Sequence, residues 1–198
     1  MKKTVLSALL AAQLLTQVQA GGDIEPVAEA VETEAVETAE SPFYVVAKGM
    51  MIFGDSVNHE ESLLDGDMDY GYGIDFGYRI GSGFAVEYDF SYSRNEIKET
   101  KGNGDVEDVK GRYYTSAIDL VYTYELTETL GVFGKVGYEW EWEKITALDV
   151  DKSDHDFVFG VGTEIAMDEA FKFVVEYEHS LIEGPRGDTL FAGIQYNF

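Results

Sequence analysis

The feature that most constrains the fold is an alternation of residue types with a period of two, which is clearest over residues 69–80. The even positions there, from Tyr70 to Ile80, carry aromatic or branched side chains, whereas the odd positions carry Gly, Asp or Arg. Successive side chains of a β-strand point to opposite faces. The pattern therefore predicts a strand with one apolar face and one polar face.

Similar alternation recurs along the chain and predicts eight strands in one domain. The segments are 43–53, 69–80, 84–93, 113–122, 130–143, 157–165, 171–178 and 189–198. The first is the least regular: Lys48 indicates that its even positions face the polar side, but Met50 and Ile52 share that side. An even number of strands, each near the ~9–11 residues that a tilted strand needs to cross a bilayer, predicts an all-β, eight-stranded antiparallel up-and-down transmembrane β-barrel.

A soluble barrel would show the same alternation with its apolar face inside, so other features must decide between the two. Aromatic residues on the apolar face gather near strand ends, as in the girdles at a membrane interface. The girdle expected near the outer rim comprises Tyr70, Tyr72, Tyr92, Tyr114, Trp140, Trp142 and Tyr177. The opposite face is rich in glycine and charge, which suits a narrow polar lumen.

The N-terminal region predicts export. Residues 1–20 combine Lys2 and Lys3, a short apolar run and a small-residue site ending at Ala20, which is typical of a cleaved signal peptide. Residues 21–42 carry seven acids and no base, and we expect a disordered acidic linker. The barrel is then expected over 43–198.

The connections predict the orientation of the barrel. Those at 81–83, 125–129 and 167–169 are short, whereas those near 54–67, 95–111, 145–155 and 180–188 are longer and polar. Short turns are typical of the periplasmic side. We therefore expect a location in the outer membrane of a Gram-negative cell, with both termini and the N-terminal tail in the periplasm.

The end of the chain carries a more specific signal, Ile194-x-Tyr196-x-Phe198, and 159–164 form a Gly-rich segment, Phe-Gly-Val-Gly-Thr-Glu. With these features, 43–198 resembles the small outer-membrane β-barrels of the porin family, which include the transmembrane domain of outer-membrane protein A. The resemblance implies that Ile194, Tyr196 and Phe198 form the signal recognised by the outer-membrane assembly machinery. It also implies outer-membrane lipid, including lipopolysaccharide, as surroundings and partner, and we expect a monomer.

The polar face predicts a network of charges in the lumen. Its members are Lys48, Asp75, Arg79, Glu87, Asp89, Asp119, Lys135, Glu139, Glu164, Lys172 and Glu176. Buried charges persist when they are paired or hydrated, so we expect ion pairs that plug the lower half of the barrel. Two roles stay open: a structural or passive pore that passes small solutes and prefers cations, or a closed barrel that binds partners or adheres through its outer loops.

Other functions find less support in the sequence. The formal net charge of −24 argues against nucleic acid as a partner. Acidic residues at 65–69 and 149–156 raise the alternative of divalent-cation binding, but an EF-hand loop starting at Asp65 would need Gly and Glu where the chain has Tyr70 and Phe76. We therefore expect solvated loops, no metal site and no cofactor. His59, His155 and His179 with Ser180 show no spacing of a nucleophile and its base. No catalytic residue, and no enzyme, is therefore predicted.

Overall fold

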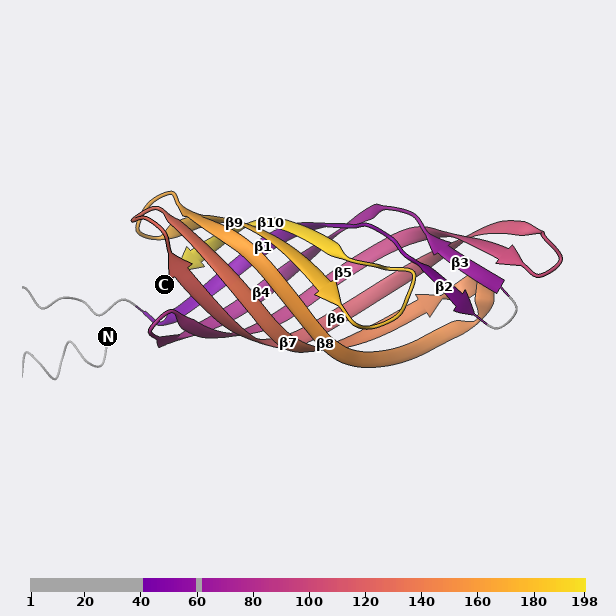
Figure 1. Ribbon diagram of the computed structural model, residues 1–198, viewed down its shortest axis with the longest axis horizontal. Coiled ribbons are helices and arrows are strands. Elements are labelled where there is room, and N and C mark those ends of the chain that lie inside the picture. Colours follow the sequence, from indigo (N-terminus) through magenta and orange to yellow (C-terminus); the bar gives the residue numbers. More distant parts are fainter. Residues whose placement is uncertain (1–40, 60–61) are drawn as a thin grey trace, which may run out of the picture. The chain divides into compact units, whose positions relative to one another are not determined.

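The computed structural model describes residues 41–59 and 62–198, so the expected signal peptide and nearly all of the expected linker lie outside the described residues. The described residues form antiparallel strands and one 3₁₀ turn (Figure 1). The elements are β1 (Phe43–Ile52), β2 (Ser56–His59), β3 (Ser62–Gly66), β4 (Asp69–Gly81), β5 (Phe84–Lys101), β6 (Val106–Glu125), β7 (Leu130–Ile145), η1 (Thr146–Leu148), β8 (Val150–Ala166), β9 (Phe171–Ser180) and β10 (Thr189–Asn197). No helix in this described part is long and apolar enough to cross a membrane.

Eight of these strands close into a ring. Each pairs antiparallel with its two neighbours in the order β1-β4-β5-β6-β7-β8-β9-β10, and β10 pairs again with β1. The other two strands, β2 and β3, form a hairpin whose second strand pairs with β5. The predicted eight-stranded up-and-down barrel is confirmed, and closure leaves its wall without a free edge.

The barrel has two different ends. At the turn end lie the tight connections after β4, β6 and β8, together with the start of β1 and the C-terminal residue. The turn after β4 needs a left-handed backbone, and Gly81, Ser82 and Gly83 all have positive φ there. At the hairpin end, β5 to β8 and the β2–β3 hairpin continue past β9, β10 and β1, as the right side of Figure 1 shows.

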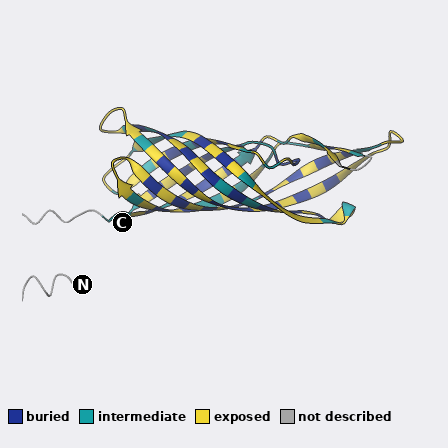
Figure 2. Ribbon diagram, turned by 60° about the horizontal axis from the view of Figure 1, so that its bottom comes forward, coloured by how far each residue is buried: buried dark blue, intermediate teal, exposed yellow. Residues whose placement is uncertain are grey.

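Burial alternates residue by residue along the wall, which gives the checkered pattern of Figure 2. In β4, Tyr72, Phe76 and Tyr78 are exposed on the outer surface, whereas Asp75 is buried in the lumen. In β1 the even positions face inward, and Met50 and Ile52 pack there against Phe191 of β10. The irregular polarity of this strand thus reflects a small apolar cluster inside the lumen.

The polarity of the two faces is reversed at the hairpin end. Tyr88 of β5 points outward and Asp89 inward, but nearer the hairpin end Lys98 points outward and Ile97 is fully buried. Ile97 packs in one apolar cluster with Leu64, Val109 and Ile145, which come from β3, β6 and β7. The apolar side chains thus lie inside the wall at the hairpin end and outside it nearer the turn end.

The residues of this apolar cluster lie mostly in segments that the sequence predicts to be long loops, and that part of the prediction is wrong. The segment 95–111 is mostly the continuation of β5 and β6, with a turn at 102–105, and 145–155 contains η1 and the first residues of β8. The segment 54–67 contains the β2–β3 hairpin. Only 181–188 lacks helix and strand, and it connects β9 to β10.

Candidate functional site

The centre of the lumen is crossed by a layer of charged side chains from five strands. Each lies at an inward-facing position in the part of its strand whose outward side chains are mostly apolar. We call this group the central layer: Lys48 of β1, Asp75 of β4, Glu87 and Asp89 of β5, Lys135 of β7 and Glu176 of β9. All six residues are at least nine-tenths buried.

Lys48 joins three strands of the central layer. Its Nζ atom lies 2.9 Å from Oδ1 of Asp75, 2.5 Å from Oδ2 of Asp89 and 3.7 Å from Oε2 of Glu176. Of these three, only Asp89 accepts a hydrogen bond, so the other two carboxylates are held by charge. A buried ammonium group is tolerated because opposite charges surround it.

Lys135 makes the second set of contacts in the central layer. Its Nζ atom lies 2.6 Å from Oε2 of Glu87 and 3.0 Å from Oε1 of Glu176. The hydroxyl of Tyr44 donates a 2.6 Å hydrogen bond to the other oxygen of Glu87. Because Glu176 lies near both lysines, the two sets of contacts form one network.

The central layer carries more acids than bases. Its two lysines have a formal charge of +2 and its four carboxylates a formal charge of −4, if all are ionised. Uncompensated charge in a narrow lumen requires a bound proton, a cation or water. The layer therefore places charged side chains across the centre of the lumen, with a formal excess of two negative charges when all its groups are ionised.

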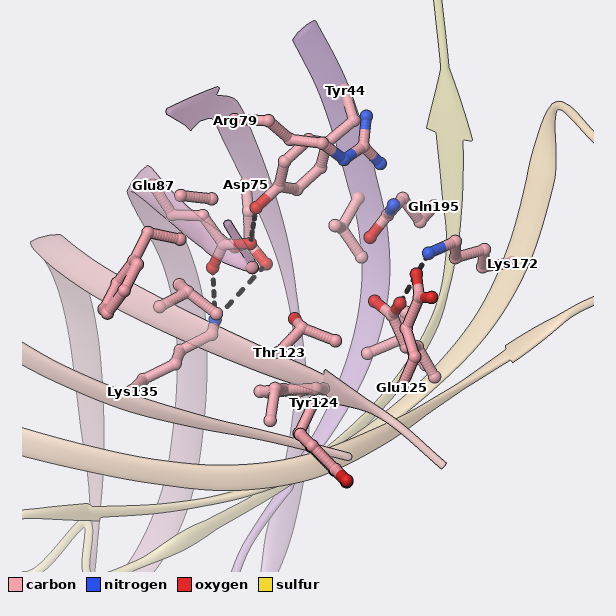
Figure 3. A pocket seen from close by; sticks show the side chains of 18 of the residues that line it. Tyr44, Asp75, Arg79, Glu87, Thr123, Tyr124, Glu125, Lys135, Lys172 and Gln195 are labelled. Carbon is pink, nitrogen blue, oxygen red and sulfur yellow. Dashed lines mark hydrogen bonds and ion pairs between the residues drawn. The ribbon is translucent and has the colours of Figure 1, made fainter. Parts of the chain in front are cut away.

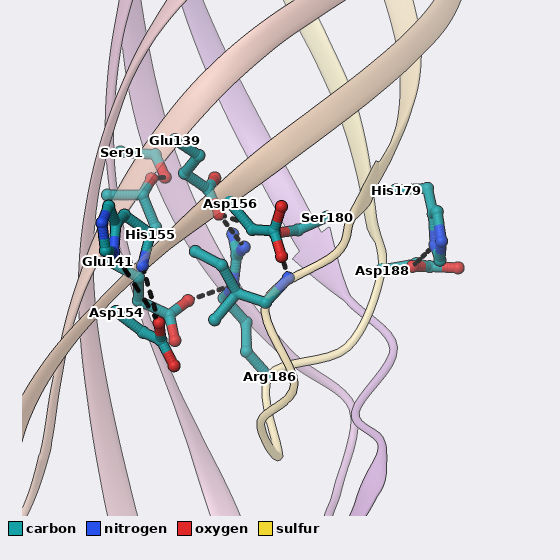
Figure 4. Close-up of polar contacts among 12 residues, drawn as sticks. Ser91, Glu139, Glu141, Asp154, His155, Asp156, His179, Ser180, Arg186 and Asp188 are labelled. Atoms are coloured by element: carbon teal, nitrogen blue, oxygen red, sulfur yellow. Dashed lines mark hydrogen bonds and ion pairs between the residues drawn. The ribbon is translucent and has the colours of Figure 1, made fainter.

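A second layer of paired charges lies in the lumen on the hairpin side of the central layer. Arg186, in the connection between β9 and β10, turns its side chain into the barrel and is 3% exposed (Figure 4). Its Nη2 atom donates a 2.6 Å hydrogen bond to Oε1 of Glu139, and its Nε atom lies 2.6 Å from Oε2 of Glu141. The hydroxyl of Ser180 donates a further hydrogen bond of 2.9 Å to Glu139. We call Arg186, Glu139 and Glu141 the loop layer.

The connection that carries Arg186 is tied to the barrel by its backbone. The carbonyl of Arg186 accepts a hydrogen bond from the amide of Gly54, and the carbonyl of Pro185 accepts one from the side chain of Asn95. Burial by itself would lower the pKa of the Arg186 guanidinium, but the carboxylates of Glu139 and Glu141 outweigh it and raise that pKa. The guanidinium thus stays charged, and the loop layer holds this connection inside the barrel.

A cavity of about 560 Å³ lies between the turn end and the central layer (Figure 3). Asp75, Glu87 and Lys135 of the central layer form its inner boundary, and Gly81 to Gly83 line it at the turn end. The cavity thus extends part of the way through the barrel and ends at the ion pairs.

The remaining residues of the predicted lumen network lie apart from the central layer. Lys172 pairs with Glu164 at 2.5 Å near the turn end. Arg79 lies over the ring of Tyr44 and donates a hydrogen bond to Asn197, but forms no ion pair with any described residue. Asp119 is buried, and it too has no ion-pair partner among the described residues. Of the predicted lumen charges, six thus lie in the central layer, Glu139 lies in the loop layer with Arg186 and Glu141, and Lys172 and Glu164 pair near the turn end.

Comparison with known proteins decides the family. A family model described as "outer membrane protein beta-barrel domain" matches residues 7–198. The chain belongs to this outer-membrane β-barrel family. Membership places the described barrel in the outer membrane, with its outward apolar face against lipid.

Solved structures agree with this family in fold. The outer membrane protein OprG from Pseudomonas aeruginosa matches with a TM-score of 0.63 and 12% identity, over 80% of this chain and 97% of that one. Neisserial surface protein A matches with a TM-score of 0.55 and 16% identity, over 80% of this chain and 98% of that one. No match was found among curated protein sequences. At these identities, the likeness concerns the fold.

On the outer surface of this outer-membrane barrel, the side chains of the predicted girdle all face outward. They are Tyr70, Tyr72, Tyr92, Tyr114, Trp140, Trp142 and Tyr177. The ring of Tyr92 lies 5.5 Å from that of Tyr72 and 4.9 Å from that of Tyr114, so three neighbouring strands share an aromatic row. Ile194, Tyr196 and Phe198, the predicted assembly signal, are exposed on the same surface at the turn end.

The acidic segments weighed for calcium binding are used in other contacts. Asp65 accepts a hydrogen bond from Ser56, and Asp67 pairs with Lys98. No group of three or more His, Asp or Glu side chains is arranged to hold a metal ion within the described ranges.

Sequence reasoning missed Arg186, the residue that pairs with Glu139 and Glu141 inside the barrel. The segment 180–188 was predicted to face outside as a polar loop. A signal was present, because Arg186 is the one base in a run that also contains Pro185, Gly184 and Gly187. Proline and glycine fix or permit a sharp turn of the backbone, so an arginine between them can be held in one orientation. Such an arginine is suited to a specific ion pair.

Proposed function

We propose that this protein is a closed structural barrel of the outer membrane that acts through its outer hairpins and not as a steady channel. The observation that carries the proposal is the pair of ion-paired layers, the central layer and the loop layer, which cross one narrow lumen. A barrel of eight strands is just wide enough for side chains to fill it. Passage would require both layers to separate.

The orientation forms part of the proposal. The turn end, with its short turns, would lie in the periplasm, and the hairpin end would face outside. The N-terminal tail would then be periplasmic, since β1 begins at the turn end. In that orientation the cavity of about 560 Å³ opens towards the periplasm, and Arg186 closes the outer side.

The hairpins are the part best suited to contact a partner. The apolar cluster of Leu64, Ile97, Val109 and Ile145 holds three hairpins together beyond the membrane-facing wall. A surface on rigid strands loses less conformational entropy on binding than a flexible loop does. This favours partner binding or adhesion through a preformed surface.

Passive passage of small cations is the second candidate. The excess of two carboxylates in the central layer and the cavity beneath it favour entry of cations over anions. This role requires the contacts of Lys48, Lys135 and Arg186 to break at a rate that permits a measurable current.

Conductance of the purified barrel in planar bilayers separates the two candidates. We expect no discrete openings from the natural sequence. A matched variant, K135A/E87A/R186A/E139A, removes one base and one acid from each layer and leaves the formal charge unchanged. It should conduct, which shows that the assay detects an open lumen. Discrete, cation-selective openings of the natural sequence would instead establish passage and overturn the closed barrel.

A further inference from the structure

Two hollows at the turn end of the barrel adjoin each other. The cavity of about 560 Å³ shares Arg79, Glu125, Glu164 and Lys172 with a second hollow of about 330 Å³. The turn after β6, at 127–129, lines the second hollow, which therefore lies at the rim. Together the two hollows extend from the rim to the ion pairs of the central layer. A cavity of this size is large enough for a small organic ligand.

The inner end of the cavity is acidic. Asp75, Glu87 and Glu176 line it, and Lys135 is the one base of the central layer that does so. All three acids are at least nine-tenths buried, and each has a carboxylate oxygen that accepts no hydrogen bond in the described structure. Three carboxylates and one ammonium group leave a formal excess of two negative charges when all are ionised. A cation that enters the cavity is therefore stabilised at this end.

A second acidic position lies at the rim. Glu125, the last residue of β6, lines both hollows and forms no ion pair with any described residue. The two bases nearby are engaged, because Lys172 pairs with Glu164 and Arg79 donates a hydrogen bond to Asn197. Glu125 is thus the carboxylate at the mouth of the cavity that can accept a hydrogen bond from a ligand.

Buried apolar side chains separate the two acidic positions. We call them the apolar belt: Val46, Ala85, Val121, Phe133 and Val174. On β7, Lys135 lies at the inner end of the cavity, and Gly131 is directly opposite Glu125. Four residues at about 3.3 Å each, on a strand tilted by about 40°, separate these two levels by about 10 Å. Figure 3 shows Glu87 and Lys135 on one side of the cavity and Glu125 on the other.

We propose that the cavity binds a linear diamine, with one ammonium group at the inner acids, the other at Glu125, and the hydrocarbon chain against the apolar belt. Each ammonium group donates charge-assisted hydrogen bonds to carboxylates, and the chain loses its contact with water. A shorter diamine would leave one charge within the belt, where burial without a partner is unfavourable. In the orientation proposed above, the ligand enters from the periplasm. The site adds to the proposed function and does not depend on whether the lumen conducts.

Calorimetry of the purified barrel in detergent tests the spacing of the two charges. Diaminooctane has two ammonium groups about as far apart as the two acidic positions, diaminobutane is shorter, and octanediol has the length without the charge. Heats from micelles without protein are subtracted, and two temperatures are used because a binding heat can be zero at one of them. We expect diaminobutane and octanediol to bind at least about tenfold more weakly than diaminooctane. Equal binding of diaminobutane, or no saturable binding of diaminooctane, would overturn the proposal.

Two variants with the same change in charge test the position at the rim. E125Q removes the acid that lines both hollows, and E128Q removes an acid that lines the rim hollow but not the cavity. Both side chains are exposed, so neither change should affect folding. We expect E125Q to weaken the binding of diaminooctane about fivefold and E128Q to weaken it less than about twofold. Equal losses would assign the binding to the overall negative charge and contradict the site.

A third variant tests whether the chain of the ligand lies inside the cavity. Ala85 is a buried member of the apolar belt, and A85L fills part of the cavity without changing a carboxylate. We expect the folded variant, identified by gel mobility before and after heating, to bind diaminooctane at least about tenfold more weakly. A85V makes the smaller change if A85L does not fold. Unchanged binding by the folded variant would place the ligand elsewhere. Failure of these tests leaves the closed barrel intact, because conductance tests that proposal independently.

Discussion

The guanidinium of Arg186 and the carboxylate of Glu139 meet at 2.6 Å, although 47 residues separate them in the chain. The contact holds the side chain of Arg186, from the last connection of the barrel, inside the lumen on the hairpin side of the central layer. The free energy of unfolding of the barrel should therefore depend on whether this ion pair in the lumen is formed.

Replacing Arg186 should destabilise the barrel. R186M leaves Glu139 and Glu141 buried without their base, and loss of one partner of a buried pair costs roughly 3–5 kcal/mol. We expect the free energy of unfolding, measured in urea by tryptophan fluorescence, to fall by about 3 kcal/mol. R186M/E139Q/E141Q, which also removes the acidic charges, should regain much of the loss. As a control, K110Q breaks a contact between exposed side chains and should change it by less than about 1 kcal/mol. Equal effects of R186M and K110Q would contradict the loop layer.

Gly77 should tolerate no side chain. A Cβ atom built on it would lie 2.0 Å from the ring of Tyr44, whose hydroxyl is held by Glu87. Gly134 faces lipid, and the atom nearest to its Cβ would be 3.9 Å away. We therefore expect G77A to lower the yield of folded barrel and G134A to leave it nearly unchanged, as judged by gel mobility without heating. A normal yield of G77A would show that Tyr44 moves aside freely.

The outer hairpins should resist proteolysis, because they are held by an apolar cluster. Lys98, Lys101 and Lys110 lie in the β5–β6 hairpin, and trypsin added to intact cells should cleave there slowly. I97D places a charge in the cluster, where Ile97 is fully buried, and should make the same sites cleavable within minutes. E96Q changes an exposed neighbour on the outer face and serves as the control. Rapid cleavage of the natural sequence would indicate that the hairpins are loose.

Loss of the last residue should impair assembly. The amide of Phe198 donates a hydrogen bond to the carbonyl of Phe43, and its ring lies 5.1 Å from that of Tyr196. Deleting Phe198 should reduce the amount of barrel recovered from the outer membrane several-fold, with accumulation in the periplasm. F198Y keeps the ring and should assemble normally. Normal recovery of the shortened chain would refute the proposed assembly signal.

The sequence allowed the barrel to be predicted, because one physical rule acts on every strand in the membrane. Lipid on one side and a polar lumen on the other impose the alternation, so 69–80 was assigned as a strand close to the bounds of β4, Asp69–Gly81. The same rule assigns Lys48, Asp75 and Lys135 to the inward face, and all three are buried. Their partners were harder to predict, because pairing across a lumen depends on the relative heights of strands that are not neighbours.

Two features of the structure could not be predicted from the alternation of residue types. The outer parts of β5 and β6 were assigned to a loop because their outward residues, such as Lys98 and Lys110, are charged and their inward ones, such as Ile97, are apolar. That order is opposite to the one inside the membrane. Arg186 was missed because its inward direction depends on contacts of the backbone with Asn95 and Gly54, which the local sequence does not specify.

The reversal of polarity along β5 also fixes how deep the molecule sits. The outward band from Phe84 to Tyr92 contains nine residues, which at about 3.3 Å each and a tilt of about 40° rise about 23 Å. A shift of the barrel towards the outside would expose Phe84 to water, and a shift towards the periplasm would move Arg94 into the hydrocarbon core. The height of this apolar band therefore matches one hydrocarbon thickness, and a thicker bilayer would have to thin locally around the barrel.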